Sequence, residues 1–121
     1  MLMFDEYKKL IEEASQRVYA VAKLTDLDYA TQLSLRHNNK IWLKREDQQS
    51  VFSYKIRGAY NLIASLSKSE RDRGVIAASA GNHAQGVALA AKHLNLKSII
   101  VMPKTTPEIK IDSVKRMDAE V

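Results

Sequence analysis

The sequence predicts an α/β fold, in which an open parallel sheet carries flanking helices. Two short apolar runs, GVIAAS from Gly74 and KSIIVMP from Lys97, fit buried parallel strands. Between them, residues 83–94 place small and apolar side chains at the spacing of a helix. A strand, a helix and a second strand in this order imply a right-handed crossover on a parallel sheet.

The first fifty residues predict two helices and one strand. Apolar residues recur every three or four positions from Asp5 to Ala22, which is typical of an amphipathic helix. Thr25 and Asp26 offer capping side chains for a second, short helix through Leu35, and Asn38-Asn39 predicts its stop. The segment KIWLKRED then predicts a strand that lies ahead of the α/β unit and is compatible with a separate sheet.

The remaining residues predict helices that alternate with the two strands. A helix from Ile56 to about Lys68 gives way to the polar segment SKSERDRG, which we expect to be a loop. The helix after GVIAAS ends at Asn95, and Thr106-Pro107-Glu108 starts another helix with a cap, a proline and an acid. Residues 118–121 resemble the approach to a third strand, so we expect the sheet to be unfinished at its end.

Composition limits the class of protein. With 121 residues and 45% hydrophobic content, the chain suffices for one modest core. It has no cysteine, which excludes disulfides, thiolate metal sites and a cysteine nucleophile. The start, MLMFDEYKKLIEEASQ, lacks the apolar run of a signal peptide, and no later segment is long enough to span a bilayer. We therefore expect a cytoplasmic protein with no membrane partner.

The net charge of +5 raises the question of nucleic-acid binding. The 19 basic residues are scattered along helical patterns and paired with acids, as in KREDQ and SKSERDRG. Neutralising phosphates takes a continuous basic stripe. We expect no nucleic-acid partner, and a mildly basic surface also suits an anionic small ligand.

The turn after GVIAAS is the first candidate binding site, because ligands of open α/β sheets bind where strands end and helices begin. Backbone N–H groups and the positive end of the next helix favour a carboxylate or a phosphate there. The turn has neither the GxGxxG spacing of a dinucleotide site nor the pattern of a P-loop, and a purely structural corner is the alternative. The turn consists of Ser79, Ala80, Gly81, Asn82 and His83.

Lys55 is the candidate nucleophile. In SVFSYKIRGAYN it follows the aromatic residues Phe52 and Tyr54 and lies at or near the start of a helix. Burial beside aromatic rings and the positive helix end would favour a neutral amine, which can form an imine with a carbonyl. A solvated surface lysine is the alternative. The three histidines show no metal-ligand spacing, so no metal site is predicted.

Together, SYKIRGAYN and SAGNHAQG resemble the two motifs of the pyridoxal-phosphate enzymes of the tryptophan-synthase-β type, known as fold type II. The family patterns are S-F-K-x-R-G-A and S-[AST]-G-N-H-[AG]-Q-G. Within the family, the chain resembles the threonine dehydratase and serine dehydratase/racemase branch. The flanking segments, which include WLKREDQQS and VMPKTTPEIK, are most similar to biosynthetic threonine dehydratases, and the resemblance covers nearly every residue.

The resemblance implies roles for both segments. Pyridoxal 5'-phosphate would be the cofactor, and Lys55 would bind it covalently and move the α-proton of the substrate. The ring of Tyr54, where the family usually has phenylalanine, would lie against the pyridine, and Asn82 would hydrogen-bond its phenolic oxygen. The substrate carboxylate would be held by the whole turn, which comprises Ser79, Ala80, Gly81, Asn82 and His83.

The implied reaction is dehydration and deamination of L-threonine, and of L-serine, to 2-oxobutanoate or pyruvate and ammonia. This reaction leads into the biosynthesis of isoleucine, a branched-chain amino acid. Alternatives are a non-enzymatic truncated α/β module that self-associates, and a relative of serine racemase or serine dehydratase.

The resemblance also implies a division of the chain. Residues 1–50 would belong to a larger domain, and residues 51–121 would form an incomplete small α/β domain that carries both motifs. The loop that binds the cofactor phosphate and the rest of the larger domain would lie beyond Val121. We expect an N-terminal part that is weak or inactive alone, and that forms a homo-oligomer or pairs with the missing C-terminal part.

Overall fold

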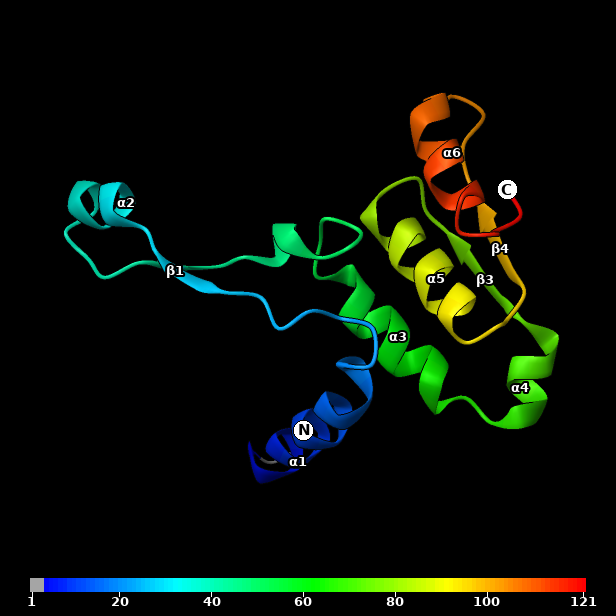
Figure 1. Cartoon of the computed structure of the whole chain (residues 1–121), viewed down its shortest axis with the longest axis horizontal. Helices are drawn as coiled ribbons and strands as arrows, with labels where there is room; N and C mark the ends of the chain where they lie inside the picture. The colour runs from blue at the N-terminus through cyan, green and yellow to red at the C-terminus, as the bar shows by residue number, and fades with distance from the viewer. Residues whose placement is uncertain (1–3) are drawn as a thin grey trace.

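The computed structural model describes residues 4–121, which form an α/β body and a projecting arm (Figure 1). In the body, β3 (Val75–Ala78) and β4 (Ser98–Val101) pair in parallel, and α5 (Asn82–His93) connects them. A single parallel bridge between Ile99 and Glu120 continues the sheet beyond β4. The predicted α/β fold class with a parallel sheet is therefore confirmed.

Helix α5 lies at the centre of the body, with α3 (Lys55–Ser65) and α6 (Glu108–Lys115) packed against it. Small residues on α5 allow close packing. At Gly86 the close neighbour is α3, since a Cβ placed there would lie 3.0 Å from the carbonyl carbon of Lys55. The core consists mainly of aliphatic side chains from these helices and from β4: Ile56, Ala59, Ile63, Ala84, Val87, Ala88, Ala90, Ile100 and Val114.

The arm is residues 27–44, and it extends away from the body in Figure 1. It consists of the antiparallel strands β1 (Leu27–Tyr29) and β2 (Trp42–Lys44), with α2 (Thr31–Arg36) between them. The strand within KIWLKRED and its separate sheet are confirmed. The predicted helix is wrong over residues 27–29, where Tyr29 pairs with Trp42 and their ring centroids lie 5.1 Å apart. A partner strand decides this conformation, which local capping signals do not reveal.

The other helices follow the sequence with three corrections. Helix α1 (Phe4–Val18) confirms the predicted amphipathic helix and packs against α3, but it ends four residues before the predicted Ala22. The short 3₁₀ helix η1 (Glu46–Gln48) follows β2. The segment expected as a loop forms α4 (Lys68–Arg73), because Ser67 and Glu70 cap it reciprocally. Helix α3 consequently ends at Ser65, a few residues earlier than predicted.

Helix α6 begins at Glu108, with Pro107 at the N-cap rather than at the first helical position. The predicted cap is absent, since the buried Thr106 hydroxyl has no hydrogen-bond partner within residues 4–121. The stops predicted at Asn38 and Asn95 are confirmed, and both residues have the positive φ angles common for asparagine after a helix.

Candidate functional site

Lys55 is the first residue of α3, and its side chain is half-buried. Its Nζ lies 4.8 Å from the centroid of the Tyr54 ring, and it has no hydrogen bond or ion pair within residues 4–121. The predicted enclosure by aromatic side chains is wrong in extent, because Phe52 is 78% exposed and Tyr54 is 58% exposed. The amine therefore has a ring beside it and is open to a reactant from solvent.

The two residues ahead of Tyr54 have unusual local structure. Phe52 has a φ of 54°, which is uncommon for a bulky side chain. Ser53 is 7% exposed, and its hydroxyl has no hydrogen-bond partner within residues 4–121. Backbone strain and an unpaired buried hydroxyl next to a lysine are features that concentrate at functional sites.

The predicted anion-binding turn lies where β3 ends. The N–H of Ser79 donates to the carbonyl of Val101 at 3.0 Å, and the Ser79 hydroxyl accepts from the N–H of Gly81 at 3.3 Å. In the part of the chain that the structure describes, no side chain caps α5, which begins at Asn82, so its first N–H groups are available to an anionic ligand. A Cβ at Gly81 would meet no atom of residues 4–121 within 4 Å, so there is open space beside the turn.

Two hollows adjoin this turn, and the predicted residues divide between them. An open cleft of about 430 Å³ lies at the carboxyl ends of β3 and β4, with Ser79 and Ala80 in its lining. His83 instead lines an apolar groove of about 240 Å³ between α3 and β3. Asn82 and His83 are both exposed. The five residues of the turn are therefore adjacent along the chain but do not line one pocket.

Packing of α3 on α5 brings the lysine and the turn to the same end of the two helices (Figure 1). Gly86 fixes the distance, because the Lys55 carbonyl carbon lies only 3.0 Å from the position of its absent Cβ. Asn82 precedes Gly86 by about one helical turn, or roughly 6 Å of rise along α5. The backbone of Lys55 and the uncapped start of α5 are thus close neighbours.

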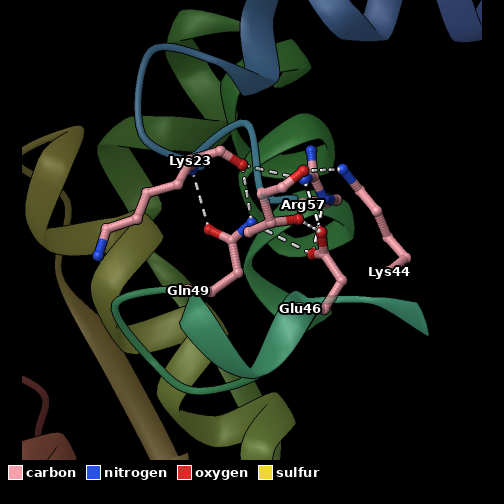
Figure 2. A network of polar contacts seen from close by, with 6 residues as sticks. Lys23, Lys44, Glu46, Gln49 and Arg57 are labelled. Atoms are coloured by element: carbon pink, nitrogen blue, oxygen red, sulfur yellow. Dashed lines mark hydrogen bonds and ion pairs between the residues drawn. The ribbon is translucent and has the colours of Figure 1, made fainter. Parts of the chain in front are cut away.

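A polar network anchors the first turn of α3 from the other side (Figure 2). Arg57 donates from Nε and Nη2 to the two carboxylate oxygens of Glu46, each at 2.8 Å. The Gln49 amide donates to the carbonyl of Lys23 and accepts from its N–H, both at 2.9 Å. Thr25 donates its hydroxyl proton to Glu46 at 2.6 Å. Segments 23–25 and 46–49 are thereby joined to α3.

This network strongly lowers the pKa of Glu46. Hydrogen bonding by the Arg57 guanidinium lowers the pKa of Glu46 from 4.5 to about 2, and the hydroxyl of Thr25 and the amide of Gln49 contribute to the lowering. Burial opposes the shift. The pKa of Arg57 is raised, first of all by its hydrogen bonds to Glu46. Both groups are therefore charged over a wide pH range.

The residues at this end of the helices fit a cofactor that bears an aldehyde, an aromatic ring and an anionic group. Over the described range Lys55 offers an amine without a polar partner, Tyr54 offers a ring face, and the α5 start offers N–H donors that no side chain caps. Within residues 4–121 no three His, Asp or Glu side chains are grouped to bind a metal. No helix over the same range combines the length and hydropathy needed to cross a membrane.

Comparison with known proteins defines the class. Residues 19–121 match the family described as pyridoxal-phosphate dependent enzyme. The chain belongs to this family, as the two motifs predicted.

Individual relatives narrow the resemblance. Over 116 residues the chain is 54% identical to the biosynthetic L-threonine dehydratase of Haemophilus influenzae, and the match covers 96% of this chain and 23% of that protein. Among solved structures, the processed form of threonine deaminase isoform 2 from Solanum lycopersicum superposes with a TM-score of 0.88 at 50% identity, covering 99% of this chain and 33% of that one. Maize serine racemase gives 0.86 at 34% identity, covering 91% and 33%. The predicted similarity to threonine dehydratases is confirmed, and the chain spans about a quarter of the curated relative's length.

Sequence reasoning gave no role to Glu46, Gln49 or Arg57. The sequence does contain an indication of the Glu46–Arg57 ion pair. Arg57 follows Lys55 by two residues, and Glu46 lies in the KRED segment at the end of a predicted strand. The pairing of these charges is visible only after the chain has folded. The individual roles of Lys55 and of the turn residues stay predictions.

Proposed function

We propose that this chain carries the lysine and the anion-binding turn of a pyridoxal-phosphate-dependent threonine dehydratase. The whole protein would eliminate water from L-threonine, and from L-serine, and release ammonia, giving 2-oxobutanoate or pyruvate. The single observation that carries this proposal is an amine that has no polar partner within residues 4–121 and lies at the same end of a helix pair as an uncapped helix start.

In this proposal each residue has a defined task. Lys55 would hold the cofactor through Nζ before the substrate binds, and the same amine, once released, would move the substrate α-proton. Tyr54 would offer its ring to the cofactor ring. Asn82 donates a hydrogen bond to the cofactor's phenolic oxygen. When bound, pyridoxal phosphate supplies an electron sink that lowers the barrier to removing the α-proton. The substrate carboxylate is held by the turn of Ser79, Ala80, Gly81, Asn82 and His83.

We also propose that residues 1–50 belong to a larger domain and residues 51–121 to a smaller one. The separate β1–β2 sheet supports this division. Apolar side chains are exposed on the arm, as at Leu35, and on the open face of β3, where Ile76 is 70% exposed. Such faces favour pairing with a C-terminal part that completes the domains, or homo-oligomerisation. Alone, the chain should have little or no activity, and a cytoplasmic location belongs to the same proposal.

Maize serine racemase superposes nearly as well as threonine deaminase, so racemisation of serine is the second candidate activity. The two activities are separated by product analysis of the full-length protein. Formation of 2-oxobutanoate from L-threonine supports the dehydratase, and D-serine as the main product from L-serine supports the racemase. A third possibility is a non-enzymatic module that self-associates. Light scattering on the 121-residue chain measures self-association, and a cofactor-binding assay on the same chain shows whether that module also binds pyridoxal 5'-phosphate.

Cofactor binding is tested directly on the chain. Pyridoxal 5'-phosphate is added to the wild type, to Lys55→Ala and to Lys68→Ala. The last change removes an exposed lysine at the start of α4, a helix that lies away from the start of α5 (Figure 1). A cofactor absorbance band that is lost in Lys55→Ala and kept in Lys68→Ala supports the proposal. Identical spectra for all three proteins contradict it.

A further inference from the structure

Building on the proposed function, we propose that Glu46, Gln49 and Arg57 are positioning residues. Their network holds the first turn of α3 in place, and thereby fixes the Lys55 amine relative to the uncapped start of α5. None of the three touches the amine itself within the described residues 4–121, so their influence passes through the helix backbone.

Helix α3 needs such an anchor because its own start is unfavourable. Tyr54 occupies the N-cap and makes no side-chain capping hydrogen bond with any described residue, and the first turn contains no acidic residue. It does contain two cations, Lys55 and Arg57, at the positive end of the helix dipole. A helix that begins in this way frays readily. The Glu46 carboxylate supplies the missing negative charge from another part of the chain.

The Glu46–Arg57 contact fixes orientation as well as charge. Two parallel N–H···O bonds of 2.8 Å hold the guanidinium plane against the carboxylate. The pair is largely buried, with side-chain exposures of 16% and 24%. A bidentate pair with so little exposure resists rotation much better than an exposed pair, because fewer water molecules compete for its hydrogen bonds.

Gln49 secures the same junction to the backbone. It is 1% exposed, and its amide bonds to both the N–H and the carbonyl of Lys23. Arg57 donates to that same carbonyl at 3.0 Å. Lys44 reaches the adjoining carbonyl of Thr25, which ties the end of β2 to the junction. The buried polar groups are satisfied by one another, so the loss of one partner disturbs the whole network.

Lys55 is thereby held between two supports. The Arg57 network anchors the turn of α3 that follows it, and the Gly86 contact sets the distance of its backbone from α5. If only Gly86 acted, the start of α3 could still fray. With both supports, the amine has a defined place before a reactant arrives, which is the structural basis of preorganisation.

A matched control lies one residue away. Arg45 donates to both carboxylate oxygens of Asp47, at 2.9 and 2.8 Å, in the same bidentate manner. This pair is more exposed, with side-chain exposures of 35% and 61%. Within residues 4–121 the Arg45 guanidinium bonds Asp47 and Asp28, neither of which lies on α3. Asp47→Asn therefore removes a similar ion pair without touching the proposed anchor.

The experiment compares wild type, Glu46→Gln, Arg57→Lys and Asp47→Asn as the 121-residue chain. Hydrogen exchange of the amides in the first two turns of α3 reports on the helix start, and circular dichroism verifies folding. In parallel, each protein is treated with pyridoxal 5'-phosphate and borohydride, and peptide mass spectrometry compares labelling of Lys55 with labelling of the exposed Lys68.

We expect exchange in the first two turns of α3 to accelerate on the order of tenfold in both Glu46→Gln and Arg57→Lys. Glu46→Gln leaves the Arg57 charge without its acidic partner, and Arg57→Lys loses the two parallel hydrogen bonds of the guanidinium. The preference for Lys55 over Lys68 should fall in the same two variants and persist in Asp47→Asn. Arg57→Lys retains the positive charge. If Glu46→Gln does not fold, Arg57→Lys alone tests whether the network positions Lys55.

Folded variants with unchanged exchange and unchanged labelling overturn the proposal. Faster exchange with unchanged Lys55 labelling also overturns it, since the network then serves stability alone. A wild type that shows no preference for Lys55 contradicts the proposed function instead. In that case the exchange data still decide whether the network holds the start of α3.

Discussion

The close approach of α5 to α3 predicts opposite responses from two glycines that both lie inside helices. Gly86 in α5 faces the backbone of Lys55 and Ile56, whereas a Cβ at Gly58 in α3 would meet no atom of the described residues within 4 Å. Both glycines are replaced by alanine, one at a time. Because each change puts alanine into a helix, the gain in helix propensity, about 1 kcal/mol, is common to both.

The difference between the two variants isolates the packing cost. At position 86 the new methyl group would lie 3.0 Å from the Lys55 carbonyl carbon, 3.1 Å from its oxygen and 3.2 Å from the Ile56 nitrogen. All three are backbone atoms, so one helix has to move by a few tenths of an ångström. Overpacking of this kind costs about 1–3 kcal/mol. Gly58→Ala should therefore be more stable than Gly86→Ala by that amount.

Urea unfolding followed by circular dichroism measures both free energies of unfolding on the same chain. We expect Gly58→Ala to exceed the wild type in stability and Gly86→Ala to equal it or fall below it. Labelling of Lys55 by pyridoxal 5'-phosphate and borohydride adds a second readout, which should drop only in Gly86→Ala. Equal stability changes for the two variants would refute the assignment of Gly86 as the contact that spaces the helices.

Two further predictions concern acid and a strained glycine. The pKa of Glu46 is lowered from 4.5 to about 2, so its contribution to stability is complete above about pH 4.5 and is lost as the pH falls toward 2. The stability difference between wild type and Glu46→Gln, measured by urea unfolding, should therefore shrink over this interval, and a constant difference would contradict the shift. Gly74 has a φ of 77°, and a Cβ there would lie 2.6 Å from the Lys97 carbonyl oxygen. Gly74→Ala should destabilise the chain by more than about 1 kcal/mol in the same assay, and an unchanged unfolding midpoint would count against it.

The parallel β–α–β unit was predictable because its signals are local. Two apolar runs mark β3 and β4, small residues at helical spacing mark α5, and Asn95 marks its end. The capping box that starts α4 was also legible, since Ser67 and Glu70 have the spacing of that motif. Its hydrophilic composition favoured a loop instead. Local capping chemistry outweighed composition there.

Features that depend on distant partners were not predictable in the same way. Strand β1 exists because β2 pairs with it, so capping signals at Thr25 misled. That threonine bonds Glu46 and starts no helix. Phe52 is 78% exposed and has a φ of 54°, and no residue type in the segment indicates either feature. The two site motifs were identified by resemblance to a family. The polar network around Glu46 and Arg57 joins segments far apart in the sequence, so it is visible only in the folded chain.

The hydrogen bonds to the backbone of Lys23 have an evolutionary consequence. Gln49 and Arg57 bond to the main chain of residue 23, while its side chain is exposed and takes no part in these bonds. Natural selection can therefore exchange this side chain almost freely across descendants. Proline is the exception, since it lacks the hydrogen that the glutamine oxygen receives. At position 23 the side chain is therefore free to vary, whereas the N–H and the carbonyl of its peptide groups are constrained.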